Sequence, residues 1–134
     1  GPGVWLHPTE NAMYFYMNSY KDIQNEVFVS NIPIGKWFHC TLSVTQNHMN
    51  IYINGFLKVR KTLKGIAKQN FGDVYINAFG GFDGLMSRMR YYDYAISLSE
   101  VRVDVEKGPD LELPYQSRQS PPYLTPYWWV NEYE

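Results

Sequence analysis

Cysteine is almost absent from this chain. Cys40 is the only one among 134 residues, so no disulfide can form within the chain, and a zinc site built on several thiolates is excluded. The sequence also has no apolar run of about 18 residues, no Asn-x-Ser/Thr acceptor and no N-terminal signal peptide. Such a chain could fold in a reducing compartment, although a piece of a larger secreted protein would share these features.

An excess of charge of one sign is also missing. Twelve Lys and Arg face 13 Asp and Glu, giving a net charge of −1, so we expect neither nucleic-acid binding nor membrane insertion. Locally the balance shifts, because residues 58–68 carry five bases and no acid: Lys58, Arg60, Lys61, Lys64 and Lys68. This basic patch either contacts phosphates or sulfated sugars, or belongs to an edge strand whose charges prevent edge-to-edge aggregation.

Aromatic residues are plentiful. They make up 17% of the chain, a composition that favours pleated sheets over disorder or helical bundles. With 134 residues and 45% apolar content, the chain is long enough for one well-buried core and no second one. The composition therefore predicts one all-β domain.

Residues 36–60 carry the clearest strand pattern. Apolar side chains alternate with polar ones from Phe38 to Val44, as in a half-buried strand that begins at Trp37. The polar residues 46–48 then turn the chain into a second strand, and Asn54-Gly55 turns it into a third. Asn-Gly between alternating runs is a strong hairpin signal, because both residues tolerate the positive φ of a type I′ turn.

Further strands are predicted on both sides of this region, over residues 12–17, 26–29, 72–78 and 85–94. Ser97 and Glu100 form a capping box, which predicts one short helical turn near residues 97–104. Residues 1–3 resemble the remnant of a protease cleavage site and are set aside. We expect the β-sandwich domain over residues 4–107, followed by a Pro-rich, aromatic tail over residues 108–134 that packs on the domain or on a partner.

The order of these signals resembles the laminin-G-like, concanavalin A-like jelly-roll superfamily of lectins and glucanases. Lys36-Trp37-Phe38-His39 is similar to a strand start of that family, and Ile51-Tyr52-Ile53-Asn54-Gly55 is similar to one of its hairpins. Residues 82–97 look like its closing strand. The resemblance implies an antiparallel β-sandwich of jelly-roll type. Members usually carry additional N-terminal strands, so the chain is either a compact member or a piece of a larger polypeptide.

Some segments resemble a narrower version of this domain, encoded by large DNA viruses of algae and protists. These segments are residues 68–77, Gly80-Gly81-Phe82, Pro122-Tyr123-Leu124 and Trp128-Trp129. In those viruses such domains are often assigned to virion-associated proteins. The resemblance implies a location in the virion or host cytoplasm if the chain is viral, and an extracellular one if it is a fragment of a secreted protein.

The sequence carries no recognisable enzymatic motif. Retaining glycoside hydrolysis needs two carboxylates about 5 Å apart on one face, and the related glucanases place three acids on one strand. Here the nearest set of acids, Glu100, Asp104 and Glu106, falls on the predicted helix and its exit. His39 and Cys40 cannot form a nucleophilic pair, because neighbours on a strand point to opposite faces. We expect no enzymatic activity.

The glycine-rich loop after residue 76 is the best candidate ligand site. Asn77 and Asp83 could bind sugar hydroxyls, while Phe79 and Phe82 could stack on a sugar ring. The alternative is that the glycines only make a tight turn and both Phe rings lie in the core. Calcium is a weaker expectation, because it needs six or more oxygens and only Asp73 and Asp83 are obvious carboxylates nearby.

The aromatic tail suggests a different role. Its large rings, Tyr123, Tyr127, Trp128 and Trp129, are of the kind enriched at interface centres, so the tail either docks on the domain's own sheet or binds another protein. Two functions therefore remain: a lectin-like carbohydrate-binding module, and a structural or assembly protein of a viral particle. The partner is a glycan or another protein of an assembly, and the oligomeric state stays open.

Overall fold

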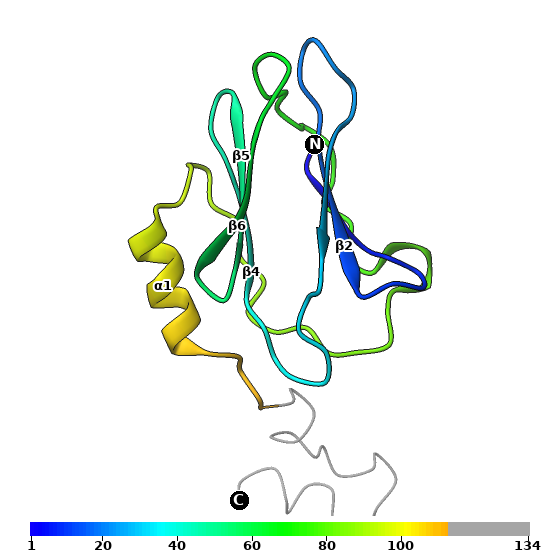
Figure 1. The fold of residues 1–134 in the computed structure, drawn as a ribbon, viewed down its shortest axis with the longest axis vertical. Coiled ribbons are helices and arrows are strands. Elements are labelled where there is room, and N and C mark those ends of the chain that lie inside the picture. The colour runs from blue at the N-terminus through cyan, green and yellow to red at the C-terminus, as the bar shows by residue number, and fades with distance from the viewer. Residues whose placement is uncertain (113–134) are drawn as a thin grey trace, which may run out of the picture.

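Two antiparallel sheets of three strands each face one another in the computed structural model, which describes residues 1–112 (Figure 1). The first sheet has the order β1-β2-β3 and contains β1 (Gly3–Leu6), β2 (Ala12–Met17) and β3 (Asn25–Ser30). The second sheet has the order β4-β5-β6 and contains β4 (Cys40–Val44), β5 (His48–Ile53) and β6 (Phe56–Thr62). The prediction of an all-β, antiparallel sandwich is confirmed.

The core lies between the two sheets. From the first sheet, alternate residues such as Phe15 and Val27 turn inward and are buried, and from the second sheet Met49 and Ile51 meet them with no exposed surface. The predicted apolar face of the β4 region packs against this cluster: Phe38, Cys40, Leu42 and Val44. Period two in the sequence therefore identifies the inner face of the strands correctly.

The hairpin between β5 and β6 forms where the sequence predicts it. Asn54 and Gly55 have φ values of 51° and 79°, as a type I′ turn requires. The Asn54 side-chain oxygen also accepts a hydrogen bond of 2.8 Å from the backbone N–H of His39. This bond ties the hairpin to the chain just before β4, which begins at Cys40 rather than at Trp37.

Helix α1 (Leu98–Lys107) covers the outer face of the second sheet. Ser97 caps its N-terminus with the predicted capping box, and the helix runs for ten residues, longer than the turn that the sequence suggests. Val101 is fully buried against Tyr52 and Ile96 in a second apolar cluster. Asp104 fastens the helix from the side, because its carboxylate accepts a 2.7 Å hydrogen bond from the Tyr92 hydroxyl and pairs with Arg90 at 3.1 Å.

Two predicted strands are wrong, and one strand was not predicted. Residues 72–78 and 85–94 form no strand; only a short 3-10 turn, Ala78–Gly80, interrupts this stretch. Neither stretch is paired with a strand among the described residues, and left-handed φ values interrupt the extended backbone at Asn77, near the end of the first stretch, and at Arg88, within the second. In contrast, β1 starts at Gly3, a residue that the sequence analysis set aside, and pairs with β2.

Among residues 1–112, no helix has the length and apolar character that crossing a membrane requires.

Candidate functional site

The outer face of the first sheet is aromatic where a solvent-facing strand surface is usually polar. On β2 and β3, three of the five residues that alternate with the buried ones are aromatic, and all three keep part of their surface exposed: Tyr14, Tyr16 and Phe28. Strand pairing adds Trp5 of β1, which lies directly opposite Tyr14. We call this surface the aromatic face; its rings are Trp5, His7, Tyr14, Tyr16, Phe28 and Phe79.

Besides the separate Trp5–Phe79 pair, the rings of the aromatic face form one group of His7, Tyr14, Tyr16 and Phe28. Tyr14 lies at its centre, with ring centroids 5.2 Å from Phe28, 5.5 Å from His7 and 6.1 Å from Tyr16. These separations are those of favourable aromatic pairs. Each ring is therefore held in place by its neighbours before a ligand binds. The face is therefore a preformed surface of flat rings.

Phe79 reaches this surface from the glycine-rich loop. Its ring is 95% exposed and stacks on Trp5, with centroids 6.0 Å apart and an angle of 30° between the planes. The loop follows the side of the first sheet that faces away from the second sheet (Figure 1). Left-handed φ values of 54° at Asn77 and 59° at Phe79, followed by Gly80 and Gly81, turn the chain so that this ring points outward.

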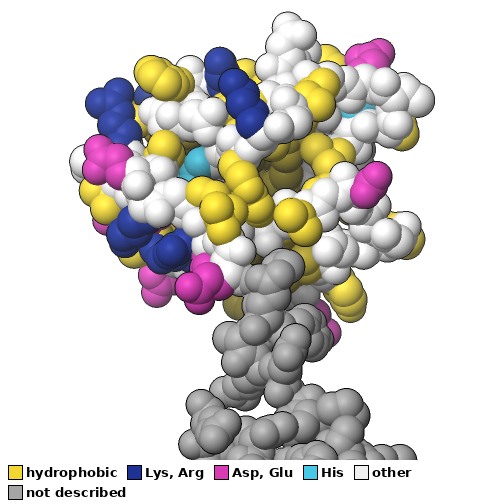
Figure 2. Space-filling model, turned by 90° about the horizontal axis from the view of Figure 1, so that it is seen from below, with side chains coloured by type: hydrophobic (Ala, Val, Ile, Leu, Met, Phe, Trp, Pro, Cys, Tyr) yellow, Lys and Arg dark blue, Asp and Glu magenta, His cyan; other side chains and the backbone are white. Residues whose placement is uncertain are grey.

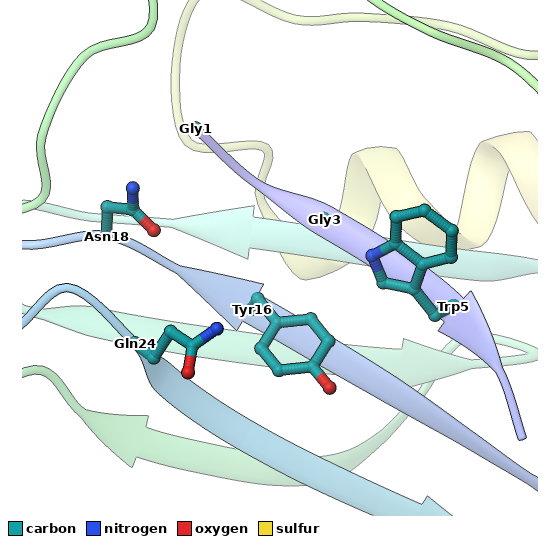
Figure 3. Close-up of a pocket in the computed structure, with 6 residues that line it drawn as sticks. All are labelled: Gly1, Gly3, Trp5, Tyr16, Asn18 and Gln24. Atoms are coloured by element: carbon teal, nitrogen blue, oxygen red, sulfur yellow. The ribbon is translucent and has the colours of Figure 1, made fainter. Parts of the chain in front are cut away.

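A hollow of about 450 Å³ opens beside the rings (Figure 3). It is lined by apolar and amide groups, with Trp5 and Tyr16 on one side and Asn18 and Gln24 on the other. Gly3 keeps the space between the two rings open, because a Cβ at this position would lie 3.2 Å from Trp5 Nε1. Amide side chains next to aromatic faces suit a ligand that carries both hydroxyl groups and apolar surface.

A buried polar network positions the amide side of the hollow. Asn25 is almost fully buried; its amide donates to the Met17 carbonyl at 3.1 Å, and its oxygen accepts from the Lys64 N–H at 3.1 Å. Next to it, the backbone N–H of Gln24 and the ammonium of Lys64 hold the pKa of Asp22 below its usual value. These bonds fix the loop between β2 and β3, which carries Asn18 and Gln24.

An acidic side chain, Glu26, lies next to the aromatic face. Glu26 is paired with Tyr16 across the strands, and neither the six rings nor the lining of the hollow includes Lys or Arg. Desolvation, followed by the nearby Glu26 carboxylate, raises the pKa of Tyr16. The Glu26 carboxylate therefore disfavours an anion bound next to Tyr16.

The predicted loop site is only partly assembled. Within residues 1–112, Phe79 is the one of its four members that stacks on a ring of the sheet, while Phe82 lies against Gly84 and Asp83 is exposed. Neither Phe ring is buried in the core, since Phe82 keeps 41% of its surface exposed. Asp73 and Asp83 belong to no cluster of three or more His, Cys, Asp or Glu side chains that could hold a metal ion in this part of the chain.

The basic patch is spread over several surfaces. Lys61 donates a 2.6 Å hydrogen bond to the Glu26 carbonyl across the sandwich edge, and Lys64 pairs with Asp22 at 3.3 Å. Lys58 lines a smaller hollow of about 160 Å³ near the β5–β6 turn. Arg60 and Lys68 are exposed. The five cations do not converge on one site.

The Asp104 carboxylate and the Cys40 thiol are engaged in structural contacts or buried. Asp104 binds Tyr92 and Arg90, and burial raises the pKa of Cys40 to about 12, which keeps the thiol protonated. Burial lowers the pKa of His39, whose ring lies 3.3 Å from the Thr41 hydroxyl. The predicted interface residues Tyr123, Tyr127, Trp128 and Trp129 lie outside the described residues.

Comparison with known proteins identifies the family. The model of the concanavalin A-like lectin/glucanases superfamily, of laminin G type, matches residues 2–102. The chain belongs to this superfamily. A domain of this superfamily presents the fold that the two sheets show, and carbohydrate binding is the type of function that the superfamily's description suggests.

One solved structure is similar to this superfamily domain. It is residues 221-444 of an S-layer domain-containing protein from Clostridium thermocellum ATCC 27405, with 15% sequence identity and a TM-score of 0.44. The match covers 78% of this chain and 62% of that one, so the chain spans less than two thirds of that structure. No curated protein matched the chain.

Phe79 is the one residue of the aromatic face that the sequence predicts as a candidate; the other five are not predicted. A signal was available, since Tyr14, Tyr16 and Phe28 occupy the positions that alternate with the core residues of two predicted strands. Aromatic residues on both faces of a strand indicate that the outer face also makes contacts. Trp5 could not be added, because β1 was not predicted.

Proposed function

We propose that this superfamily domain is a non-catalytic carbohydrate-binding module and that its ligand lies on the aromatic face. The observation that carries the proposal is Phe79, a ring held outward by a left-handed turn and stacked on Trp5 at the edge of a preformed aromatic surface. The family match over residues 2–102 supports the same class of function.

The chemistry of the surface fits a sugar. A pyranose ring with equatorial hydroxyls has two apolar faces of C–H groups, which pack on aromatic rings, and a rim of hydroxyls, which need donors and acceptors. The aromatic face supplies the rings, and Asn18 and Gln24 supply amide groups at the edge of the hollow. The acids of α1 support a non-catalytic role, because Asp104 is engaged by Tyr92 and Arg90.

Phe79→Ala tests the proposal, with Phe71→Ala as its matched control. Both rings belong to the same connecting segment and are almost fully exposed, at 95% and 92%, but only Phe79 stacks on Trp5. We expect Phe79→Ala to weaken glycan binding about tenfold and Phe71→Ala to leave it unchanged. A glycan array followed by calorimetry on the full chain measures this, and equal effects of both variants would contradict the proposed site.

A second candidate function is an assembly role in a particle, with a virion as the assembly that the sequence resemblance suggests. Large apolar side chains are exposed along residues 71–94, and hydrophobic groups gather on the face of the molecule seen in Figure 2. Exposed apolar surface of this extent favours protein contacts. This candidate would be favoured over the lectin-like one if the protein bound no glycan on the array and self-associated with rising concentration in sedimentation experiments.

A further inference from the structure

We propose that the aromatic face takes a neutral polysaccharide and binds it along the interior of the chain, rather than at an end or as a short acidic glycan. This inference rests on the proposed function, because it names the class of carbohydrate for the same site. It follows from three properties of the face: the alignment of its rings, its open shape and its charge.

The rings are aligned across the strands. Trp5 is the register partner of Tyr14, and Tyr14 is the register partner of Phe28, so the three residues form a straight row perpendicular to the strands. Since neighbouring strands lie about 4.8 Å apart, the row spans roughly 10 Å from Trp5 to Phe28. Phe79 adds a fourth ring, 6.0 Å from Trp5. We call these four residues the aromatic row.

A row of this length suits several sugar rings in succession. One monosaccharide would cover only part of the row and leave the other rings in water, whereas an extended chain can place an apolar sugar face on each. The residues at the two ends, Phe79 and Phe28, are both exposed, so a bound chain can continue past either end. An open sheet surface of this kind binds chain interiors.

The charges of the site select against acidic glycans. Glu26 stands beside Tyr16 on this face, and no Lys or Arg belongs to the aromatic row or lines the hollow. Carboxylate and sulfate groups on a glycan would meet the like charge of Glu26, and the row and the lining of the hollow offer no Lys or Arg side chain to bind them. The same argument disfavours single-stranded nucleic acid, which also stacks on aromatic rows but depends on a cationic groove for its phosphates.

Two basic side chains of residues 58–68 are held at the edge of the sandwich by other groups. Lys61 binds the Glu26 carbonyl through its ammonium group, and Lys64 forms an ion pair with Asp22. Arg60 follows Val59, whose side chain packs against the core from the second sheet, so its own side chain faces away from the first sheet. Lys61 and Lys64 are therefore engaged at the edge of the sandwich, and Arg60 points away from the aromatic row.

Affinity electrophoresis or calorimetry of the full 134-residue chain at low salt tests the inference. The neutral set is xyloglucan, glucomannan and mixed-linkage β-glucan; the anionic set is polygalacturonate, heparin and poly(dT). We expect at least one neutral polysaccharide to bind about tenfold more tightly than every anionic polymer. For that polysaccharide, the affinity of its oligosaccharides should rise with length, and reducing the terminal sugar to an alditol should leave the affinity unchanged.

Substitutions at the two ends of the row test the binding mode. Phe28→Ala and Phe79→Ala should each weaken binding of the long chain about tenfold, while Phe71→Ala should not. A site for one or two sugars would respond at one end only, which would overturn the inference. Glu26→Lys should raise binding to polygalacturonate severalfold, because it replaces the repelling carboxylate with a cation. Circular dichroism and thermal melting of each variant separate lost binding from lost folding.

The possible failures can be told apart. Tighter binding to polygalacturonate or heparin than to the neutral polysaccharides, or a disaccharide that binds as tightly as the polymer, overturns this inference and leaves the carbohydrate-binding function intact. Binding to poly(dT) in preference to every glycan overturns both in favour of a nucleic-acid ligand. No binding to any polymer or glycan also overturns both.

Discussion

A single residue, Phe79, shows how the site is built at the finest scale. Its φ of 59° belongs to the left-handed region, which is rarely occupied by a bulky side chain. The next two residues, Gly80 and Gly81, also have positive φ values, of 97° and 71°. Glycine adopts such values without strain, but position 79 carries a phenylalanine. A strained residue that is kept exposed rather than buried is more easily explained by binding than by stability.

This strain makes a prediction about stability. Phe79→Gly and Phe79→Ala both remove the ring, but only glycine relieves the left-handed backbone. We expect the free energy of unfolding of Phe79→Gly to exceed that of Phe79→Ala by about 1 kcal/mol. Urea unfolding followed by tryptophan fluorescence measures the difference.

Ala78→Gly serves as the control for this comparison. Ala78 precedes Phe79 in the same turn but does not have a positive φ. Glycine at this position should therefore lower the free energy of unfolding, by about 0.5 kcal/mol or more. The left-handed conformation of Phe79 would be refuted if Phe79→Gly were less stable than Phe79→Ala, just as Ala78→Gly should be less stable than the unsubstituted chain.

At the scale of elements, helix α1 depends on its N-terminal cap. The Ser97 side chain accepts from the Glu100 N–H, and the Glu100 carboxylate accepts from the Ser97 N–H at 2.8 Å. That backbone N–H, followed by the Ser97 and Tyr94 hydroxyls, holds the pKa of Glu100 below its usual value. The carboxylate is therefore stabilised in the folded state, and its protonation must weaken the fold.

The pH dependence of Glu100→Gln tests this cap. Because the folded pKa of Glu100 is lowered, its contribution is complete above its unfolded pKa of about 4.3 and is lost as the pH falls through the folded value. Glutamine also completes a capping box but does not titrate. We expect Glu100→Gln to flatten the decline of unfolding free energy between about pH 6 and about pH 3.

Glu106→Gln is the matched control, since Glu106 is an exposed acid near the other end of the same helix. It should leave the acid branch of the stability curve close to that of the unsubstituted chain. Denaturant titrations at a series of pH values supply both curves. A Glu100→Gln curve parallel to the unsubstituted one would show that the cap does not depend on the charge.

The elements that the sequence predicts well are those defined by local chemistry. The Asn54-Gly55 turn and the Ser97 cap each need only a few neighbouring residues, and the structure has both. Residues 72–78 and 85–94 show why alternation alone is insufficient. Alternation says which side a residue would face in a strand, whereas a ladder also needs a partner and unbroken extended φ values. Arg88, with a φ of 51°, interrupts the second stretch without any glycine to signal it.

The candidate site could be predicted only in part, because it depends on register. The sequence points to Phe79 through its glycine-rich surroundings. It does not show that Trp5, Tyr14 and Phe28 form one row, since a shift of one residue between strands would turn the rings of one strand to the other face. The connection between β2 and β3, residues 18–24, is too long for turn type to fix that register.

For the molecule as a whole, the two outer faces of the sandwich have different roles. The second sheet is covered by α1 through the cluster of Tyr52, Ile96 and Val101. The first sheet leaves its aromatic rings partly exposed. Since the buried core separates the two faces, stability and binding should be separable by mutation.

Val101→Ala and Phe79→Ala test this separation as a pair. Val101 has no exposed surface, so removing two methyl-sized groups beneath α1 should lower the free energy of unfolding by about 2 kcal/mol. Its glycan affinity, measured where the variant is fully folded, should stay within about twofold of the unsubstituted chain. Phe79 is 95% exposed, so Phe79→Ala should change stability by no more than about 0.5 kcal/mol while losing binding. Weaker glycan binding by folded Val101→Ala would instead show that the sandwich couples its two outer faces, and the aromatic row would then depend on α1 for its alignment.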